Sequence, residues 1–198
     1  MTVPAPRIPL FKFRLATQAD VDAIVALVES TYRGDASRAG WTTEADLLEG
    51  RRTGADEVAT QIARADSRML LAECVAAVSD IAATQQLDGF AGDELLACAQ
   101  IAIEDGVGYF GMFSVQPHLQ NCGIGSALLS EAERIARDEW NLPCMRMTVI
   151  DVRVDLIPYY LRRGYRQTGN KKPFPYGDAR FGIPKRPDLR FEILEKIL

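Results

Sequence analysis

Two glycines, Gly123 and Gly125, stand one residue apart in residues 120–129, QNCGIGSALL, immediately before a stretch with helical spacing. Glycines at a helix start let the backbone approach a ligand closely, and the open N–H groups there can hold a phosphate. The segment contains neither Lys nor Arg. A phosphate bound here would therefore be held by main-chain N–H groups, with help from the helix dipole.

Spacing separates this segment from two well-known phosphate-binding loops. A P-loop consists of Gly, four residues of any type, and then Gly-Lys followed by Ser or Thr. The chain has no such stretch. A dinucleotide fingerprint requires a third small residue where Leu128 stands, and it usually lies in the first strand–helix unit rather than past residue 120. Neither loop explains the two glycines.

Composition limits the kinds of protein this can be. The chain has 198 residues, of which 47% are apolar and 25% charged, with a formal net charge of −4, which suits one domain over 1–198 with a lead at 1–10. No apolar run approaches the roughly 20 residues of a membrane helix, and the N-terminus lacks the apolar centre of a signal peptide. We therefore expect a cytoplasmic protein that binds no membrane. The mild acidity argues against a nucleic-acid partner and is compatible with a cationic substrate.

Cysteine spacing predicts neither a metal site nor a disulfide framework. Cys74, Cys98, Cys122 and Cys144 are scattered without metal-ligand spacing. Cys74 and Cys98 lie in apolar runs, where cysteine behaves as a small hydrophobic residue.

Hydrophobic periodicity predicts a mixed α/β sheet with the order β-α-α-β-β-β-α-β-α-β-β. Thr17 and Asp20 form a capping-box-like start for a helix over 18–33, and Asp105-Gly106 is a hairpin signal. The other expected elements are strands at 11–17, 68–78, 94–104, 108–115, 144–152, 164–169 and 189–197, helices starting in 42–50, at the glycine segment and over 155–163, and loops over 79–93 and 170–188. The helix at the glycine segment has one apolar stripe, made of Ile124, Leu128, Ala132, Ile135 and Ala136.

The glycine segment also fits a known family. In this chain Gln120 is followed by two residues, Gly123, one further residue and Gly125, and this motif comes after a strand and Val115-Gln116-Pro117. It resembles the acetyl-coenzyme A (acetyl-CoA) motif of the GNAT N-acetyltransferase superfamily. The capped first helix, the hairpin and a Tyr-x-x-x-Gly-Tyr near the C-terminus follow in the family's order, and the resemblance covers roughly residues 12–198. It implies a mostly antiparallel sheet of about seven strands with about four helices.

The resemblance implies acetyl-CoA as co-substrate and no metal. Phe113 and Val115, on either side of Ser114, would offer backbone groups to the pantetheine arm. The pyrophosphate would be wrapped by residues 120–127, which are Gln120, Asn121, Cys122, Gly123, Ile124, Gly125, Ser126 and Ala127. Because these are main-chain contacts, we expect side-chain identity to be free at Asn121, Cys122 and Ile124, and Cys122 to be incidental rather than a nucleophile.

Acetyl transfer to an amine requires an acid, a base and an oxyanion donor. The resemblance places Tyr160, four residues before Gly164, as the acid that protonates the leaving thiolate, and a backbone N–H of 113–115 as the oxyanion donor. Family members often carry a Glu on the motif strand, but YFGMFSV contains no carboxylate, so this chain departs from that version. Asp151 and Glu104 are the remaining candidate bases, each weighed against a purely structural role. His118, in the turn before the glycine segment, is expected to be solvated and not a base.

Substrate choice in this family comes from the segment after the first helix and the loop before the last strand, here 32–48 and 171–188. The pocket candidates are Trp41, Thr42, Glu44, Phe174, Tyr176 and Arg180. Glu44 could hold a cation, whereas Arg38 or Arg180 could hold a carboxylate, so the acceptor stays open.

These inferences predict an N-acetyltransferase that moves the acetyl group from acetyl-CoA to a primary amine of a small molecule, by direct attack in a ternary complex. Three alternatives stay open: a regulatory module that binds acetyl-CoA without turnover, an enzyme acting on a protein or peptide amine, and another nucleotide-binding fold. The expected partner is the small amine, and a homodimer is left open.

Overall fold

The computed structural model describes residues 10–75 and 93–198. The predicted lead at 1–10 and the predicted loop at 79–93 therefore lie outside the described residues, except for residues 10 and 93. The elements are β1 (Phe11–Leu15), α1 (Val21–Tyr32), β2 (Leu48–Glu49), α2 (Ala55–Ala63), β3 (Ser67–Cys74), β4 (Leu95–Glu104), β5 (Val107–Val115), α3 (Ile124–Arg134), β6 (Cys144–Ile150), α4 (Leu156–Leu161), β7 (Arg166–Pro173), β8 (Ile183–Pro184) and β9 (Arg190–Ile197).

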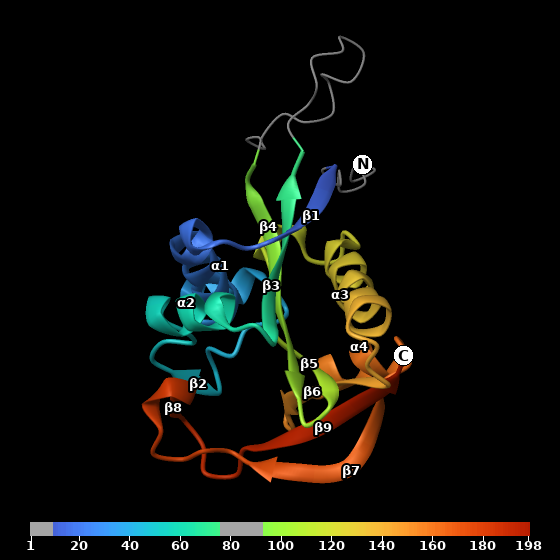
Figure 1. Ribbon diagram of the computed structural model, residues 1–198. Helices are drawn as coiled ribbons and strands as arrows, with labels where there is room; N and C mark the ends of the chain where they lie inside the picture. The colour runs from blue at the N-terminus through green and yellow to red at the C-terminus, as the bar shows by residue number, and fades with distance from the viewer. Residues whose placement is uncertain (1–9, 76–92) are drawn as a thin grey trace, which may run out of the picture.

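A seven-stranded sheet in the order β1-β3-β4-β5-β6-β9-β7 forms the centre of the fold (Figure 1). All neighbouring pairs are antiparallel except β5 and β6, which are parallel. Helices α1 and α2 lie on one side of the sheet and α3 on the other (Figure 1). The predicted mixed, mostly antiparallel fold with four helices is confirmed.

The apolar runs of β3 and β4 arise because helices cover both faces of the sheet. In β3, Met69 and Leu71 pack with α1 and α2, whereas Leu70 and Ala72 pack with α3. Successive strand residues point to opposite faces, so a strand buried on both sides is apolar throughout. No described helix has the length and apolarity that a membrane span would need.

Helix α3 is anchored by the predicted apolar stripe. Ile124, Leu128 and Ala132 are fully buried against the sheet, and Ile135 and Ala136 continue the stripe through a wider π-helical turn at Ile135–Glu139. The helix begins directly after Gly123. Packing of this stripe therefore fixes where the glycine segment sits.

Strands β5 and β6 stay together over only two residue pairs, Gly108 with Met145 and Tyr109 with Arg146. Beyond them the register between β4 and β5 shifts at Cys98 and Gln100, and Met112 adopts φ +46°. Such a bulge bends a strand and strengthens its twist. The two strands consequently diverge, which opens the sheet between its halves.

The predicted helix start at 42–50 is wrong, because the second helix begins at Ala55. Residues 42–50 instead form turns and the short strand β2, which pairs with β8 through Leu48–Pro184 and Glu49–Ile183. The Glu29 carboxylate accepts the N–H groups of Arg52 and Thr53, at 2.6 and 3.0 Å, and so fixes the approach to α2. Tertiary hydrogen bonds override the local helical signal here.

Two boundaries near the C-terminus also differ from prediction. The strand expected at 164–169 extends as β7 to Pro173, and the expected loop at 170–188 contains β8. β7 gains these residues by pairing along β9, and it is exposed along its whole length at the edge of the sheet. An exposed edge strand lacks the apolar alternation that would identify it in the sequence.

Truncating the stripe of α3 will test this packing. We expect Leu128→Ala to lower the free energy of unfolding by about 2–5 kcal/mol, because the fully buried side chain leaves a cavity. Ser130→Ala, on the exposed face of the same helix, should change it by less than about 0.5 kcal/mol. Denaturant titration of both variants measures the difference, and equal effects would contradict the assigned buried face.

Candidate active site

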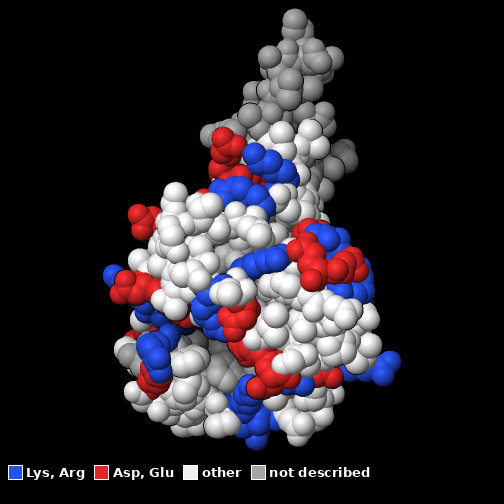
Figure 2. All heavy atoms as spheres, viewed as in Figure 1, with Lys and Arg blue, Asp and Glu red and all other residues white. Residues whose placement is uncertain are grey.

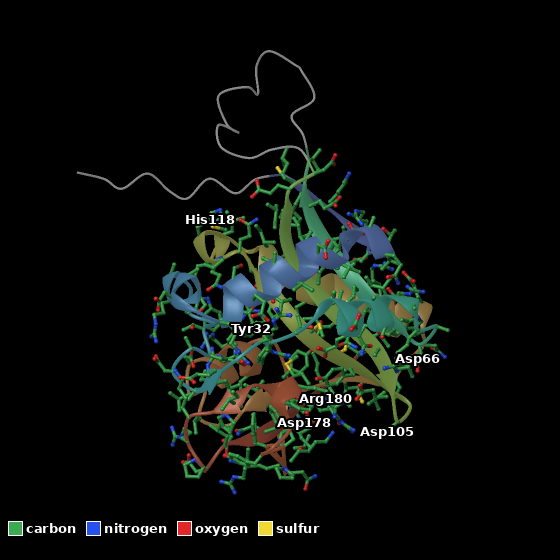
Figure 3. All side chains as sticks on the ribbon, turned by 90° about the vertical axis from the view of Figure 1, so that its left-hand side faces the viewer. Tyr32, Asp66, Asp105, His118, Asp178 and Arg180 are labelled. Atoms are coloured by element: carbon green, nitrogen blue, oxygen red, sulfur yellow. The ribbon has the colours of Figure 1, made fainter. Side chains whose placement is uncertain are left out.

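A cleft of about 480 Å³ lies where β5 and β6 diverge. The ends of both strands line it, together with α1, α4 and residues from the loops before β2 and after β7. Residues that carry polar chemistry into it include Tyr32, Glu44, Arg52, Glu104, Arg153 and Tyr160. Figure 3 views the molecule from the α1 and α2 side, with Tyr32 near its centre.

The glycine segment forms a turn with open N–H groups at the start of α3. The first i to i−4 hydrogen bond runs from the Ala127 N–H to the Gly123 carbonyl, at 3.0 Å. The preceding amides of Ile124, Gly125 and Ser126 therefore have no partner within the helix. Asn121 and Gly123 both adopt left-handed backbone conformations, with φ of +68° and +87°. A run of open amides in such a turn is a concave anion-binding surface.

The two glycines are required for different reasons. At Gly125 a Cβ atom would lie 2.9 Å from Phe113 Cζ and 3.2 Å from Val115 Cγ2, so only glycine lets α3 start this close to β5. A Cβ at Gly123 would meet nothing within 4 Å, but its positive φ disfavours any side chain.

The expectation that side chains are free at Asn121, Cys122 and Ile124 needs correction. Ile124 is fully buried in the core and Cys122 is buried. Asn121 has a positive φ, which few residues other than Gly, Asn and Asp adopt at low cost. Main-chain binding leaves side chains free only where the fold does not also use them.

The Gln120 side chain ties the glycine segment to the loop after α1. Its Oε1 accepts the Trp41 N–H at 2.9 Å, and its Nε2 donates to Thr42 Oγ1 at 2.8 Å and to the Val115 carbonyl at 3.2 Å. The buried Arg153 holds the other side of that loop, donating to the Trp41 and Thr42 carbonyls, each at 3.2 Å. Trp41 and Thr42 thus hold the loop in place and do not line the cleft.

Arg163 supplies the positive charge that the glycine segment itself lacks. Its guanidinium donates to Ser126 Oγ at 2.5 Å and lies 3.5 Å from the centre of the Tyr159 ring. Tyr159 in turn packs against Trp41, with ring centroids 5.2 Å apart. Sequence reasoning missed Arg163, although its i, i+4 spacing from Tyr159 was a usable signal.

Tyr160 is buried, lines the cleft, and has no hydrogen-bond partner for its hydroxyl among the described residues. Burial raises the pKa of this phenol well above its ordinary value, and the neighbouring Tyr32 adds to the effect. Tyr32 donates its own hydroxyl to the Phe113 carbonyl at 2.5 Å. Tyr160 therefore carries a proton at any physiological pH.

The candidate bases differ in position. Asp151 does not line the cleft; it pairs with Lys171 at 2.9 Å and Arg190 at 3.3 Å. Burial alone would raise the pKa of its carboxyl, but the hydrogen bonds from Lys171 and the Arg190 N–H outweigh burial and lower it. Asp151 is therefore a weak base that lies outside the cleft lining. Glu104, at the end of β4, lines the cleft, as does Glu44, which pairs with Arg33 at 2.6 Å.

The two segments expected to select substrate meet in the β2–β8 ribbon, but not all their predicted residues reach the cleft. Phe174 and Glu44 line it. The Tyr176 hydroxyl instead accepts the Leu189 N–H and donates to the Arg186 carbonyl. The Arg180 side chain is 84% exposed and pairs with Asp178 (Figure 3). Tyr176 and Arg180 thus lie outside the cleft lining.

The rest of the described chain adds two observations. In residues 10–75 and 93–198, no three His, Cys, Asp or Glu side chains gather as they would around a metal ion. All four cysteines are free and buried. On the face in Figure 2, basic and acidic side chains are interspersed rather than separated into fields of one sign.

Solved structures of similar fold are acetyltransferases. The PaiA N-acetyltransferase of Thermoplasma acidophilum in complex with coenzyme A superimposes with a TM-score of 0.60 at 15% identity, covering 96% of this chain and 99% of that one. A nourseothricin acetyltransferase gives 0.60 at 16%, covering 94% and 98%, and the ribosomal-protein-S18-alanine N-acetyltransferase of Escherichia coli gives 0.62 at 11%, covering 95% and 94%. These likenesses concern the fold.

No curated protein matches the sequence. The model of the acetyltransferase (GNAT) family matches residues 62–165, more than half of the chain. That stretch runs from the end of α2 through the divergent strands and the glycine segment to Tyr165. The chain therefore belongs to the GNAT family of acetyltransferases.

Proposed function

We propose that this protein transfers the acetyl group of acetyl-CoA to a primary amine of a small molecule, by direct attack in a ternary complex. One observation carries the proposal: the cleft where β5 and β6 diverge holds the unpartnered Tyr160 hydroxyl, and the start of α3, with its open amides, packs against Phe113 and Val115 of the same β5 strand. The amides suit a pyrophosphate, and the phenol suits a leaving thiolate.

The residues present fit acetyl-CoA. The glycine turn, from Gln120 to Ala127, would hold the pyrophosphate, with Arg163 adding charge beside Ser126. The edge of β5 that faces β6 makes no strand pairing beyond Tyr109, so the N–H groups of 113–115 that point to this edge, and not those paired with β4, are available to the pantetheine arm. The PaiA protein named above was crystallised with coenzyme A, which supports the same ligand here.

The proposed reaction forms a C–N bond and breaks the thioester C–S bond. A backbone N–H at 113–115 stabilises the oxyanion, and Tyr160 gives its proton to the departing sulfur. An amine with a pKa of about 10.4 must first lose a proton. Among the described residues Glu104, Glu57 and Glu44 line the cleft, and the proposed acceptor of this proton is Glu104 or Glu57, because Glu44 is paired with Arg33.

A screen for released thiol tests the function. Purified protein is mixed with acetyl-CoA and a library of small amines and of peptides with free N-termini. Release with small amines supports the proposal, and release with peptides alone moves the acceptor to proteins. Binding of acetyl-CoA with no release points to the regulatory module, and tighter binding of a dinucleotide would contradict the acetyl-CoA site.

Substitutions in the glycine turn will separate backbone from side-chain binding. Gly125→Ala should weaken acetyl-CoA binding about 5- to 100-fold, because the added Cβ pushes α3 away from Phe113. Gly123→Ala should act similarly through its positive φ. Cys122→Ala is the control, with an expected change under about twofold. Titration calorimetry ranks the three, and a larger loss for Cys122→Ala would refute main-chain binding.

Removing the Tyr160 hydroxyl should slow turnover without weakening cofactor binding. Tyr160→Phe is expected to lower kcat about 10²- to 10⁴-fold at every pH below 10, because the raised pKa keeps the phenol protonated throughout that range. The matched control is Tyr159→Phe, whose ring packing is kept. Stopped assays across pH 6 to 9 measure both, and an unchanged rate for Tyr160→Phe would remove it as the acid.

Neutralising Arg163 should raise the KM for acetyl-CoA. We expect Arg163→Gln to raise it about 10-fold with kcat little changed, since one charge-assisted contact to the phosphates is lost. Arg162→Gln is the matched control, because Arg162 is exposed and its side chain makes no hydrogen bond or ion pair with the described residues. Equal KM values for the two variants would contradict the assigned role.

A further inference from the structure

Arg52 places a half-buried guanidinium in the cleft without a partner. Its side chain makes no hydrogen bond or ion pair with the described residues; the Tyr32 ring lies 5.4 Å from Arg52 Cζ, and the carboxylates of Glu44 and Glu57 are near enough to act on its charge. The backbone there is fixed, because the Arg52 N–H donates to the Glu29 carboxylate at 2.6 Å. The start of the Arg52 side chain is therefore fixed, and its guanidinium lies among the residues that line the cleft.

Two arginines line the cleft among the described residues. Arg153 is committed to the protein, because it donates to two loop carbonyls and pairs with Asp155 at 3.3 Å, whereas the Arg52 guanidinium makes no ion pair within the described ranges. A guanidinium that makes no direct ion pair in a cleft has donors open to an anionic ligand.

Arg52 lines the same cleft as the groups proposed to react. Tyr32 lies between them: its ring faces Arg52 and its hydroxyl is bound to the Phe113 carbonyl, on the strand edge assigned to the thioester. Tyr160 lines the same cleft. When the amine of an acceptor reaches the thioester, an acidic group close to that amine would therefore face Arg52.

The chemistry of the guanidinium selects the kind of anion. Its planar fork of donors matches both oxygens of a carboxylate. Glu44 and Glu57 also act on Arg52, and they favour its charged form, although burial opposes it. Glu44 is paired with Arg33, whereas Glu57 makes no ion pair with the described residues and is an acceptor for a bound ammonium, so the cleft offers opposite charges to the two ends of one small molecule.

We infer that the acceptor is a small amine that carries a carboxylate within a few atoms of its amino group, and that Arg52 binds that carboxylate. The inference rests on the proposed acetyl transfer and narrows its substrate class to molecules of amino-acid type. The competing acceptor is a diamine, whose second ammonium would bind Glu57 and Glu104 at the rim.

Matched acceptor pairs test the inference. Phenylalanine is compared with phenethylamine, β-alanine with ethylamine, and lysine with cadaverine, by thiol release from acetyl-CoA. We expect kcat/KM to be at least about 10-fold higher for the carboxylate member of the pair that fits the cleft. Higher values for cadaverine and the other decarboxylated amines would overturn the inference while leaving the proposed acetyl transfer intact.

Substitutions of Arg52 test whether this residue causes the preference for a carboxylate acceptor. Arg52→Gln should raise the KM of the carboxylate acceptor about 10- to 100-fold, leave the KM for acetyl-CoA unchanged and abolish the preference within the pair, whereas Arg52→Lys should keep part of it. Arg51→Gln is the control, because Arg51 is exposed and lies outside the cleft. A preserved preference in Arg52→Gln would overturn the assignment.

Binding measurements distinguish failure of this inference from failure of the proposed acetyl transfer. Calorimetry with coenzyme A present measures the same acceptor pairs on the wild type and on Arg52→Gln, with no need for turnover. Selective binding of the carboxylate member, lost in Arg52→Gln, supports the inference even if no thiol is released, in which case the proposed transfer is what fails. Absence of any selectivity in both binding and turnover overturns the inference.

Discussion

The divergence of β5 from β6 is the constraint on which the rest of the site depends. The two strands pair only at Gly108–Met145 and Tyr109–Arg146, and the bulge with Met112 at φ +46° turns β5 away. An unpaired strand edge exposes N–H and C=O groups that require partners. Here that edge faces a cleft of about 480 Å³, so the open sheet both admits a ligand and supplies hydrogen-bonding groups for it.

Two polar side chains keep the opening in a defined shape. Gln120, from the glycine turn, and Arg153, from the segment after β6, hold opposite sides of the loop at Trp41 and Thr42. That loop leads to β2, which pairs with β8. The proposed cofactor site and the proposed acceptor site therefore share one hydrogen-bonded frame, in which the Gln120 side chain joins the glycine turn to the loop at Trp41 and Thr42.

Charge in the site is supplied from distant parts of the chain. The glycine turn has no cation of its own, yet Arg163 reaches Ser126 from the residues after α4. Arg52 enters the cleft from the segment before α2, and Glu104 from the end of β4. Other charged side chains form ion pairs with the protein itself: Asp151 pairs with Lys171 and Arg190, and Arg180 pairs with Asp178. What remains unpaired in the cleft is therefore informative about the ligand.

The sequence by itself determined the order of the seven strands of the main sheet and the four helices, but not the short strands β2 and β8, and it determined the stripe that buries α3 and the hairpin at Asp105-Gly106. These follow from periodicity and turn conformation, which are local properties, whereas the close approach of β5 that requires glycine at 125 is a tertiary contact. The sequence placed the second helix wrongly, and it offered Asp151, Tyr176 and Arg180 as site residues. Only the tertiary structure decided which side chains stay unpaired in the cleft, because pairing depends on contacts between segments far apart in the chain, as between Arg163 and Ser126 or Asp151 and Arg190.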